Sequence, residues 1–400
     1  MNSPRPDAMT MPMERDHPFD PPAELRRLRA GRPINRLSFP DGHLGWLVTS
    51  HAVGREVLSD PRFSAREDLR HFPVRLPLIT DQRGPARPGW FVRMDPPDHT
   101  RLRRLLTGQF TVRRMQQLTP RITAIAEEHL DRMERQGPPA DLVKGYALPI
   151  PSLVICELLG VPYEERERFQ RQTATMLRIG ATKEEFVAAM AGLGRFLHEL
   201  VLAKRAAPTD DLLGGLAAGD ELSDEELTGV AMLLLIAGHE TTANMLGLGM
   251  FALLRNPDQL AALRADPALM TSAVEELLRY LSILHTGLTR TALRDVTVAG
   301  ERVAVGETVV VAVAEANRDA GHFEAPDTLD LKRPSSTGHL AFGHGIHQCL
   351  GQQLARIEMR IGYTALLERF PNLRLAVPPG EVRVRSDMAI YGVHELPVAW

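Results

Sequence analysis

Residues 342–351 read Phe-Gly-His-Gly-Ile-His-Gln-Cys-Leu-Gly, and a well-patterned helical segment follows at once over 351–369. Three of these ten residues are glycines, which let a backbone turn tightly and approach a flat object closely. Cys349 would stand just before a helix N-terminus, where the helix dipole and unpaired N–H groups favour thiolate over thiol. Such a thiolate is a nucleophile or a metal ligand. The plain alternative is a buried cysteine that packs as a small hydrophobic side chain.

Upstream, the segment 223–254 is apolar along its length but carries Ala237-Gly238-His239-Glu240-Thr241-Thr242 at its middle. A helix that is apolar all round lies in a core, so an acid and a hydroxyl within it must be satisfied or functional. Gly238 leaves room for something flat to lie against the helix, and the Thr241 hydroxyl can bond back to the carbonyl of Ala237. The alternative is a polar interruption solvated by buried water.

Glu276 and Arg279 lie three residues apart in the amphipathic segment 269–281, so they share a helix face and can pair. Pairs of this kind are frequent on solvated surfaces, where most contribute well under ~1 kcal/mol. By itself the pair is therefore a weak functional signal.

Four cationic side chains are scattered along the chain: His99 and Arg103, which are four residues apart, Arg290 in a strand-like segment, and His347 beside the cysteine. Each alone is typical of a surface or capping group. Together they suit a ligand with two carboxylates, because arginine and histidine give charge-assisted hydrogen bonds to such groups.

The pattern over the whole chain is mainly helical with a small β portion. Pro21-Pro22 opens a short helix that Gly31 closes, and the twenty residues before it are proline-rich and predict a flexible arm. Residues 21–400 then predict a single domain. Further helices are expected over 97–108, 119–136, 148–159, 163–178, 182–205, 223–254, 256–265, 269–281 and 351–369, and strands over 34–39, 44–48, 296–304 and 308–314.

Composition excludes several classes of protein. The 400 residues carry a net charge of −3, with 44% hydrophobic and 24% charged residues, so neither nucleic acid nor a membrane surface is favoured by the overall field. Two cysteines cannot build a disulfide framework and suit a reducing compartment. No segment resembles a targeting sequence or membrane span, which predicts a cytoplasmic protein.

In order and spacing these features resemble the cytochrome P-450 superfamily of haem-thiolate monooxygenases, from about Pro21 to the C-terminus. Segments such as Asp95-Pro96-Pro97-Asp98-His99-Thr100-Arg101 and Ala316-Asn317-Arg318-Asp319 resemble soluble actinobacterial members that tailor secondary metabolites. The departures are small: Glu240 stands where aspartate is also common, and Ala320 where proline is frequent. The resemblance implies that haem b lies between a long distal helix and the helix after the cysteine loop.

The resemblance also assigns roles to individual residues. Cys349 becomes the axial thiolate ligand of iron, Glu240 and Thr241 deliver protons, and Glu276 with Arg279 and Arg333 forms a structural lock behind the haem. The cofactor-binding set implied by the family is His99, Arg103, Ala237, Gly238, Arg290, Phe342, Gly343, His347, Cys349 and Gly351. The implied substrate pocket involves the loop 68–94 together with Leu234, Ala237, Ile283, Leu284, His285, Ile390 and Tyr391.

The implied reaction inserts one oxygen atom of O2 into a C–H or C=C bond of an apolar substrate. The resemblance points first to a polyketide or macrolide-type metabolite, with terpenoids, peptides and xenobiotics as open alternatives. No dinucleotide motif is present, so the electrons of NAD(P)H would arrive through a ferredoxin reductase and a ferredoxin. A docking patch for that acidic partner is suggested by five arginines in fourteen residues without an acid, although an ordinary solvated face explains them equally well: Arg101, Arg103, Arg104, Arg113 and Arg114.

The sequence is also compatible with other functions. A haem-thiolate enzyme could use peroxide directly or catalyse oxidative coupling, and a haem protein could bind or sense a gas without turnover. A hydrolase or transferase with Cys349 as nucleophile would need a base such as His347 within reach.

Overall fold

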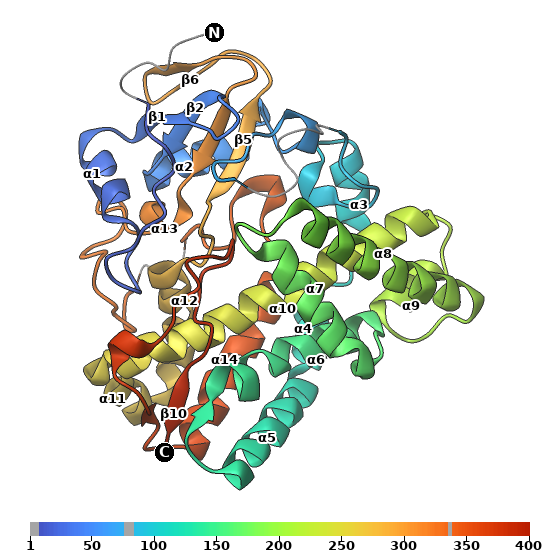
Figure 1. Ribbon diagram of the computed structural model, residues 1–400, viewed down its shortest axis with the longest axis vertical. Coiled ribbons are helices and arrows are strands. Elements are labelled where there is room, and N and C mark those ends of the chain that lie inside the picture. The colour runs from blue at the N-terminus through green and yellow to red at the C-terminus, as the bar shows by residue number, and fades with distance from the viewer. Residues whose placement is uncertain (1–7, 76–83, 335–337) are drawn as a thin grey trace.

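The computed structural model describes residues 8–75, 84–334 and 338–400. Helices dominate, as the sequence predicts, and Figure 1 shows them filling most of the molecule below and beside one sheet. The α-helices are α1 (Ala23–Gly31), α2 (His51–Ser59), α3 (Asp98–Thr107), α4 (Val112–Gln117), α5 (Thr119–Gln136), α6 (Pro149–Leu159), α7 (Arg166–Leu177), α8 (Lys183–Ala206), α9 (Leu212–Ala217), α10 (Asp224–Arg255), α11 (Pro257–Ala265), α12 (Met270–Leu281), α13 (Val313–Ala316) and α14 (Gln352–Arg369).

The strands form a minor part. They are β1 (Ile34–Ser38), β2 (Leu44–Val48), β3 (Phe63–Ser64), β4 (Ala140–Asp141), β5 (Leu288–Ala292), β6 (Val296–Val298), β7 (Glu301–Val303), β8 (Thr308–Val311), β9 (Arg374–Leu375) and β10 (Pro397–Ala399). The largest sheet has the order β1-β2-β8-β5-β3, with β2 parallel to β8 and β8 antiparallel to β5. Pairing with β8 places Arg290 of β5 opposite Val309, which fixes where this buried arginine enters the interior.

Helix α10 is the central element of the helical part. Figure 1 shows it crossing the middle of the molecule, and it packs against α6, α8, α12 and α14. Its N-terminus is fixed by a capping box, in which the Ser223 side chain accepts from the Glu226 N–H and the Glu226 carboxylate accepts from the Ser223 N–H. Most of the helix is buried because apolar residues cover every face.

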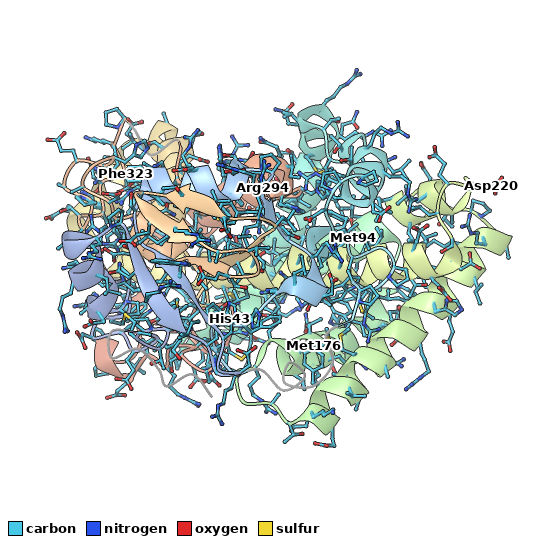
Figure 2. All side chains as sticks on the ribbon, turned by 90° about the horizontal axis from the view of Figure 1, so that it is seen from above. His43, Met94, Met176, Asp220, Arg294 and Phe323 are labelled. Atoms are coloured by element: carbon cyan, nitrogen blue, oxygen red, sulfur yellow. The ribbon has the colours of Figure 1, made fainter. Side chains whose placement is uncertain are left out.

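The view from above shows two sides to the molecule. In Figure 2, Phe323 and Arg294 lie on the side that carries the strands, and Asp220 lies at the far end of the helical side. Buried apolar residues form a large core among the helices, and two smaller cores lie against the sheet.

The N-terminal segment differs from the expectation of a flexible arm. Within its described part, the N–H of Ser38 donates to the carbonyl of Met9 at 2.7 Å, and Met11 is buried. The ring of Phe19 packs edge-on against Phe251 of α10 at 4.9 Å between centroids. The prediction of a loose arm is therefore wrong for residues 8–20. The prolines suggested a flexible segment, but its apolar side chains pack against the core.

Helix α8 is long and apolar enough to cross a membrane by length and composition, the sole such helix in the described ranges. It begins in a capping box at Thr182 and Glu185, and Lys204 near its end pairs with Asp211 at 2.5 Å. It packs against α7, α9 and α10. These contacts are those of a helix within a globular fold.

Candidate active site

The cysteine loop turns sharply where its glycines stand. Gly343 and Gly345 have φ of 70° and 75°, values that favour glycine, and a Cβ at Gly345 would lie 2.6 Å from the carbonyl oxygen of Leu58. The N–H of Cys349 donates to the carbonyl of Phe342 at 2.9 Å, which closes the loop before α14 begins. The glycines therefore serve the turn and the close approach of α2.

The thiol of Cys349 is reachable from solvent and yet surrounded by protein. Burial raises the pKa of this thiol, while the N–H of Gly351 and the charges of Arg103 and Arg356 act to lower it. In the protein without a metal, burial outweighs the expected lowering of this pKa by the helix terminus. Metal binding requires the thiolate and releases the proton, so this environment suits a metal ligand better than a free nucleophile.

The four cationic residues named from the sequence come together beside the loop. The rings of His99 (α3) and His347 lie 4.2 Å apart between centroids, and Arg103 Nη2 donates to the carbonyl of Gln348 at 2.7 Å. Burial and the neighbouring positive charges, Arg290 first among them, lower the pKa of His347 to about 3. Burial also lowers the pKa of Arg290 to about 10.

Several polar atoms of this cluster have no partner among the described residues. Both ring nitrogens of His99 and Nδ1 of His347 are buried without a hydrogen bond. Such atoms cost free energy unless a ligand satisfies them. Donors without acceptors, gathered around arginines, fit an anionic ligand with two carboxylates, which is how the propionates of haem would be held. The donor set and the neighbouring Cys349 sulfur therefore fit haem.

Helix α10 offers one opening in an otherwise buried surface. Ala237 is exposed and Thr241, one turn later, is partly exposed, whereas the segments 230–235 and 242–253 are buried. The Thr241 hydroxyl donates to the carbonyl of Ala237 at 2.8 Å, as the sequence predicts. At Gly238 a Cβ would lie 2.8 Å from Cδ1 of Ile155 in α6, so a glycine here admits the neighbouring helix.

Glu240 faces away from this opening. It is 3% exposed, and its Oε2 accepts from Arg385 Nη2 at 3.1 Å and from Asn244 Nδ2 at 3.3 Å. Adjacent residues on a helix point about 100° apart, so the carboxylate and the Thr241 hydroxyl do not share a direction. The contact with Arg385 was not indicated by the sequence, because 145 residues separate the partners.

Glu276, Arg279 and Arg333 form one buried cluster. Arg279 donates to both carboxylate oxygens of Glu276, at 2.7 and 2.8 Å, and Arg333 Nε donates to the same oxygens at 3.1 Å. Glu276 and Arg279 are fully buried. The pairing that looked weak on a helix surface is therefore a buried network, as the family resemblance implied.

The predicted pocket residues occupy different surroundings. Leu284 and Ile390 pair through an isolated β-bridge and are partly buried, while Leu234 and Ile283 are buried. Both ring nitrogens of His285 are bonded to backbone carbonyls, those of Met388 and Met13. Of the predicted loop 68–94, residues 76–83 lie outside the described residues.

Tyr391 also lies against the N-terminal segment. It is 1% exposed and lies under the guanidinium of Arg15, at 3.9 Å from the ring centroid. This position and that of His285 place both side chains in packing contacts with residues 8–20. Sequence reasoning could not foresee this because it took that segment to be loose.

Arg93 and Arg70 were missed by the sequence reasoning. Arg93 Nε lies 3.3 Å from Oε2 of Glu67, and its charge helps to lower the pKa of Arg290 and His347. Arg70 donates to the Thr289 hydroxyl at 2.6 Å, next to Arg290. One sequence feature could have pointed to Arg93: it stands only two residues before the Asp95–Arg101 segment that resembles the family.

Comparison with known proteins gives a consistent result. The family model "Cytochrome P450" matches residues 195–388. Cytochrome P450 105C1 of a Streptomyces species is 54% identical over 98% of both chains. The crystal structure of CYP105P1 in complex with filipin I has a TM-score of 0.92 at 46% identity, covering 98% of this chain and 99% of that one. The LnmA cytochrome P450 hydroxylase from the leinamycin pathway of Streptomyces atroolivaceus has a TM-score of 0.88 at 42% identity, covering 98% of this chain and 100% of its own.

Proposed function

The chain belongs to the cytochrome P450 family of haem-dependent monooxygenases, and we propose that it inserts one oxygen atom of O2 into a C–H or C=C bond of an apolar secondary metabolite. The other oxygen atom leaves as water, with two electrons and two protons consumed. Support for a tailoring role comes from similar proteins, among them the LnmA cytochrome P450 hydroxylase of the leinamycin biosynthetic pathway.

The observation that carries this proposal is the gathering of two arginines and two histidines beside the Cys349 sulfur, with buried ring nitrogens of both histidines left without partners among the described residues. His99, Arg103, Arg290 and His347 come from four separate parts of the chain. Buried ring nitrogens without hydrogen-bond partners destabilise a packed core, whereas carboxylates of a bound cofactor would accept hydrogen bonds from them. We assign these four residues to the haem propionates and Cys349 to the iron. When bound, the haem supplies the activation of O2.

The remaining cofactor contacts follow from position in the fold. We assign Ala237 to the distal face, because it is exposed in the middle of helix α10, far from the exposed residues at the two ends of that helix, with Gly238 beside it. Phe342, Gly343 and Gly351 belong to the loop on the other face. Arg356 lies over the Phe342 ring at 4.6 Å and pairs with Glu275, which holds this aromatic side chain in place.

Thr241 and Glu240 are proposed to move protons to the oxygen site. The Thr241 hydroxyl lies at the opening of α10 and can both donate and accept a hydrogen bond. Glu240, one residue earlier, can take up a proton from solvent and pass it on once its carboxylate turns toward Thr241. Asn244 and Arg385 hold that carboxylate in its present direction.

The substrate is proposed to be a polyketide or macrolide-type metabolite. Support is limited to the apolar residues near α10 and the β-bridged pair Leu284 and Ile390, together with a structural relative that was solved with filipin I. An apolar cavity with a few polar anchors is what such a ligand requires.

We further propose that electrons reach the site from NAD(P)H through a ferredoxin reductase and a ferredoxin, and that the protein works in the cytoplasm. Arg104, Arg113 and Arg114 are exposed on α3 and α4, close in sequence to Arg103, which touches the cysteine loop. An acidic partner would be steered to this surface. Arg101 is less available, because it pairs with Glu226 of α10.

The test of the proposed function is oxygen incorporation under ¹⁸O2. The purified haem-loaded protein, with a ferredoxin and its reductase, is incubated with metabolites that change the spin state of its haem on binding. We expect product that carries one ¹⁸O atom per molecule. Product formed only with added peroxide, or dimeric product without ¹⁸O, would overturn monooxygenation in favour of peroxygenase or coupling activity.

The electrostatic surroundings of Cys349 and His347 do not favour a cysteine-nucleophile hydrolase. Burial raises the pKa of the Cys349 thiol and lowers that of His347, the reverse of what an activated pair requires.

A further inference from the structure

Two short segments, 283–285 and 389–391, pair side by side, and we call this pair the wall. Leu284 and Ile390 lie opposite each other in an antiparallel β-bridge. Backbone hydrogen bonds of 2.8 and 3.2 Å join the segments on either side of the bridge. Successive side chains of an extended chain point to opposite faces, so the wall has one face with Leu284 and Ile390 and another face with their neighbours.

The two faces of the wall differ in exposure. Leu284 and Ile390 are apolar and only partly buried, whereas His285 and Tyr391 on the other face are 5% and 1% exposed. The rings of His285 and Tyr391 lie 5.2 Å apart between centroids. An open apolar face backed by a buried one fits a partition between an apolar cavity and a covering layer. With this geometry Leu284 and Ile390 can line the proposed pocket, while His285 and Tyr391 stand behind them.

The layer that covers the back of the wall is the N-terminal segment 8–20. The guanidinium of Arg15 lies over the ring of Tyr391, 3.9 Å from its centroid. The Nε2 atom of His285 lies 3.2 Å from the carbonyl oxygen of Met13. Both buried side chains of the wall therefore meet residues from the start of the chain.

Both ends of this segment are anchored independently of the wall. Near its start, the N–H of Ser38 in β1 donates to the carbonyl of Met9 at 2.7 Å. Near its end, the Phe19 ring packs against Phe251 of α10, and Arg318 donates to the carbonyl of Phe19 at 2.9 Å. Loss of a single contact at the wall therefore leaves the segment attached at both ends, so a local effect on the wall can be measured.

His285 cannot supply the tie between segment and wall by itself. Its Nδ1 lies 3.2 Å from the carbonyl oxygen of Met388, so its two ring nitrogens face two acceptors. Burial lowers the pKa of His285, and the charge of Arg15 acts in the same direction. A neutral imidazole carries one N–H, which serves one of the two carbonyls at a time. The contact of Arg15 with Tyr391 is therefore the tie that does not depend on where this proton sits.

We propose that Arg15 is a positioning residue: its guanidinium holds the Tyr391 ring and thereby sets how far Leu284 and Ile390 project into the substrate pocket. A cation is attracted to the face of an aromatic ring, most strongly where water is excluded. Burial lowers the pKa of Arg15 to about 10, so this arginine is shielded from water and still charged near neutral pH. The inference rests on the proposed function, since it makes the N-terminal segment a determinant of which apolar molecules fit the same pocket.

The first test measures the wall without turnover, by hydrogen exchange and mass spectrometry. In Arg15→Gln the amides of 283–285 and 389–391 should exchange about threefold faster or more, while those of α5 keep their rate. Tyr391→Phe should match the wild type, because the ring stays and the lost hydroxyl has no partner among the described residues. Arg27→Gln is the matched control, since the Arg27 side chain is 72% exposed. Unchanged exchange at the wall in Arg15→Gln, or equal acceleration in α5, would overturn the inference.

The second test measures the pocket of the haem-loaded protein with two probes that bind haem iron through an imidazole nitrogen. Imidazole is small, whereas 4-phenylimidazole adds an apolar ring that needs the pocket. In Arg15→Gln the Kd of 4-phenylimidazole, read from the Soret shift, should rise about threefold or more, with that of imidazole unchanged. Arg15→Lys keeps a cation over the ring and should restore the wild-type Kd.

The outcomes of the two tests separate the claims. Equal changes in both dissociation constants, or no change in either, would overturn the positioning role of Arg15 in the pocket. A wild type whose Soret band responds to neither probe would overturn the proposed function, and the pocket role with it. The exchange result would then still decide whether Arg15 holds the wall.

Discussion

Thr241 and Glu240 are neighbours on α10 with different surroundings. Thr241 lies at the opening of the helix and bonds only to the Ala237 carbonyl among the contacts given above, whereas Glu240 is buried against Arg385 and Asn244. The two residues can therefore be separated experimentally. Removal of the Thr241 hydroxyl should lower the share of O2 that ends in product. Removal of the Glu240 carboxylate should change how product formation depends on pH.

We predict that Thr241→Ala consumes NAD(P)H without forming product in proportion. A positioned proton-transfer group contributes ~10² or more to a rate, so product per NAD(P)H should fall by at least about tenfold. Thr241→Ser keeps the hydroxyl and should retain most of the product. The measurement is NAD(P)H oxidation followed optically beside product quantified by mass spectrometry. An unchanged ratio in the alanine variant would show that Thr241 has no part in the relay.

Glu358 of α14 makes a second prediction at this scale. It is 1% exposed and accepts a hydrogen bond from Thr242 of α10, and burial raises its pKa to about 8. The raised pKa means that its contribution to stability is present below about pH 4.5 and is lost as pH rises through about 8. The loss is on the order of a few kcal/mol.

Glu358→Gln should therefore be more stable than the wild type at pH 8, with a smaller difference at pH 5. Urea unfolding at both pH values measures this. Glu368→Gln, an exposed position on the same helix, is the control and should match the wild type at both. A variant that loses stability equally at the two pH values would contradict the assigned protonation.

The sequence indicated the important residues of α10 more often than it indicated the contacts that these residues make. Thr241 bonds back to Ala237 as its spacing predicted, because that contact is local to one helix turn. That Gly238 admits a flat ligand stays a prediction, and its contact with Ile155 of α6 could not be predicted, because it depends on how two helices pack. The partner of Glu240 lies 145 residues away, and no local pattern could indicate it.

At the scale of elements, the cluster of Glu276, Arg279 and Arg333 fixes α12 to the segment that follows α13. Breaking one partner of a buried ion pair leaves an uncompensated charge and costs ~3–5 kcal/mol. We predict that Glu276→Gln loses stability of this order and binds less haem. The pair of Arg302 and Asp295, whose side chains are 76% and 44% exposed, provides the control.

Arg302→Gln should change the free energy of unfolding by less than ~1 kcal/mol, as expected for an exposed pair. Urea unfolding with haem quantified in the same preparations gives both results. Equal losses of unfolding free energy and haem in the two variants would contradict the prediction that the buried cluster stabilises the fold more than the exposed pair does.

Long elements were predicted well and short ones were missed. The expected helix over 119–136 is α5 to the residue, and the expected long helix over 223–254 is α10. Two helices of six residues, α4 and α9, were not predicted, because less than two turns gives no periodicity to detect. In α9 two consecutive glycines also lower the intrinsic helix propensity.

At the scale of the molecule, the exposed arginines of α3 and α4 form the proposed docking surface for an electron donor, and substitutions there test this proposal. We predict that charge reversal at Arg104 or Arg113 slows reduction by ferredoxin about tenfold at low salt and weakens the salt dependence, since steering contributes ~10–10³ to association rates. Arg264→Glu, exposed on α11, is the control because Figure 1 places α11 far from α3.

Stopped-flow reduction at several salt concentrations measures this effect. If neither the rate nor its salt dependence changed in the Arg104 and Arg113 variants, the partner would have to dock elsewhere. Stronger loss in the Arg264 variant would point to the α11 side.

The whole account depends on the bond between the Cys349 sulfur and haem iron. The most direct measurement is the absorption spectrum of the purified, reduced protein under carbon monoxide, for the wild type and for Cys349→Ser. We predict a strongly red-shifted Soret band in the wild type and loss of that band in the variant. A Soret band at the position found in globins, or a red-shifted band that survives Cys349→Ser, would contradict the account.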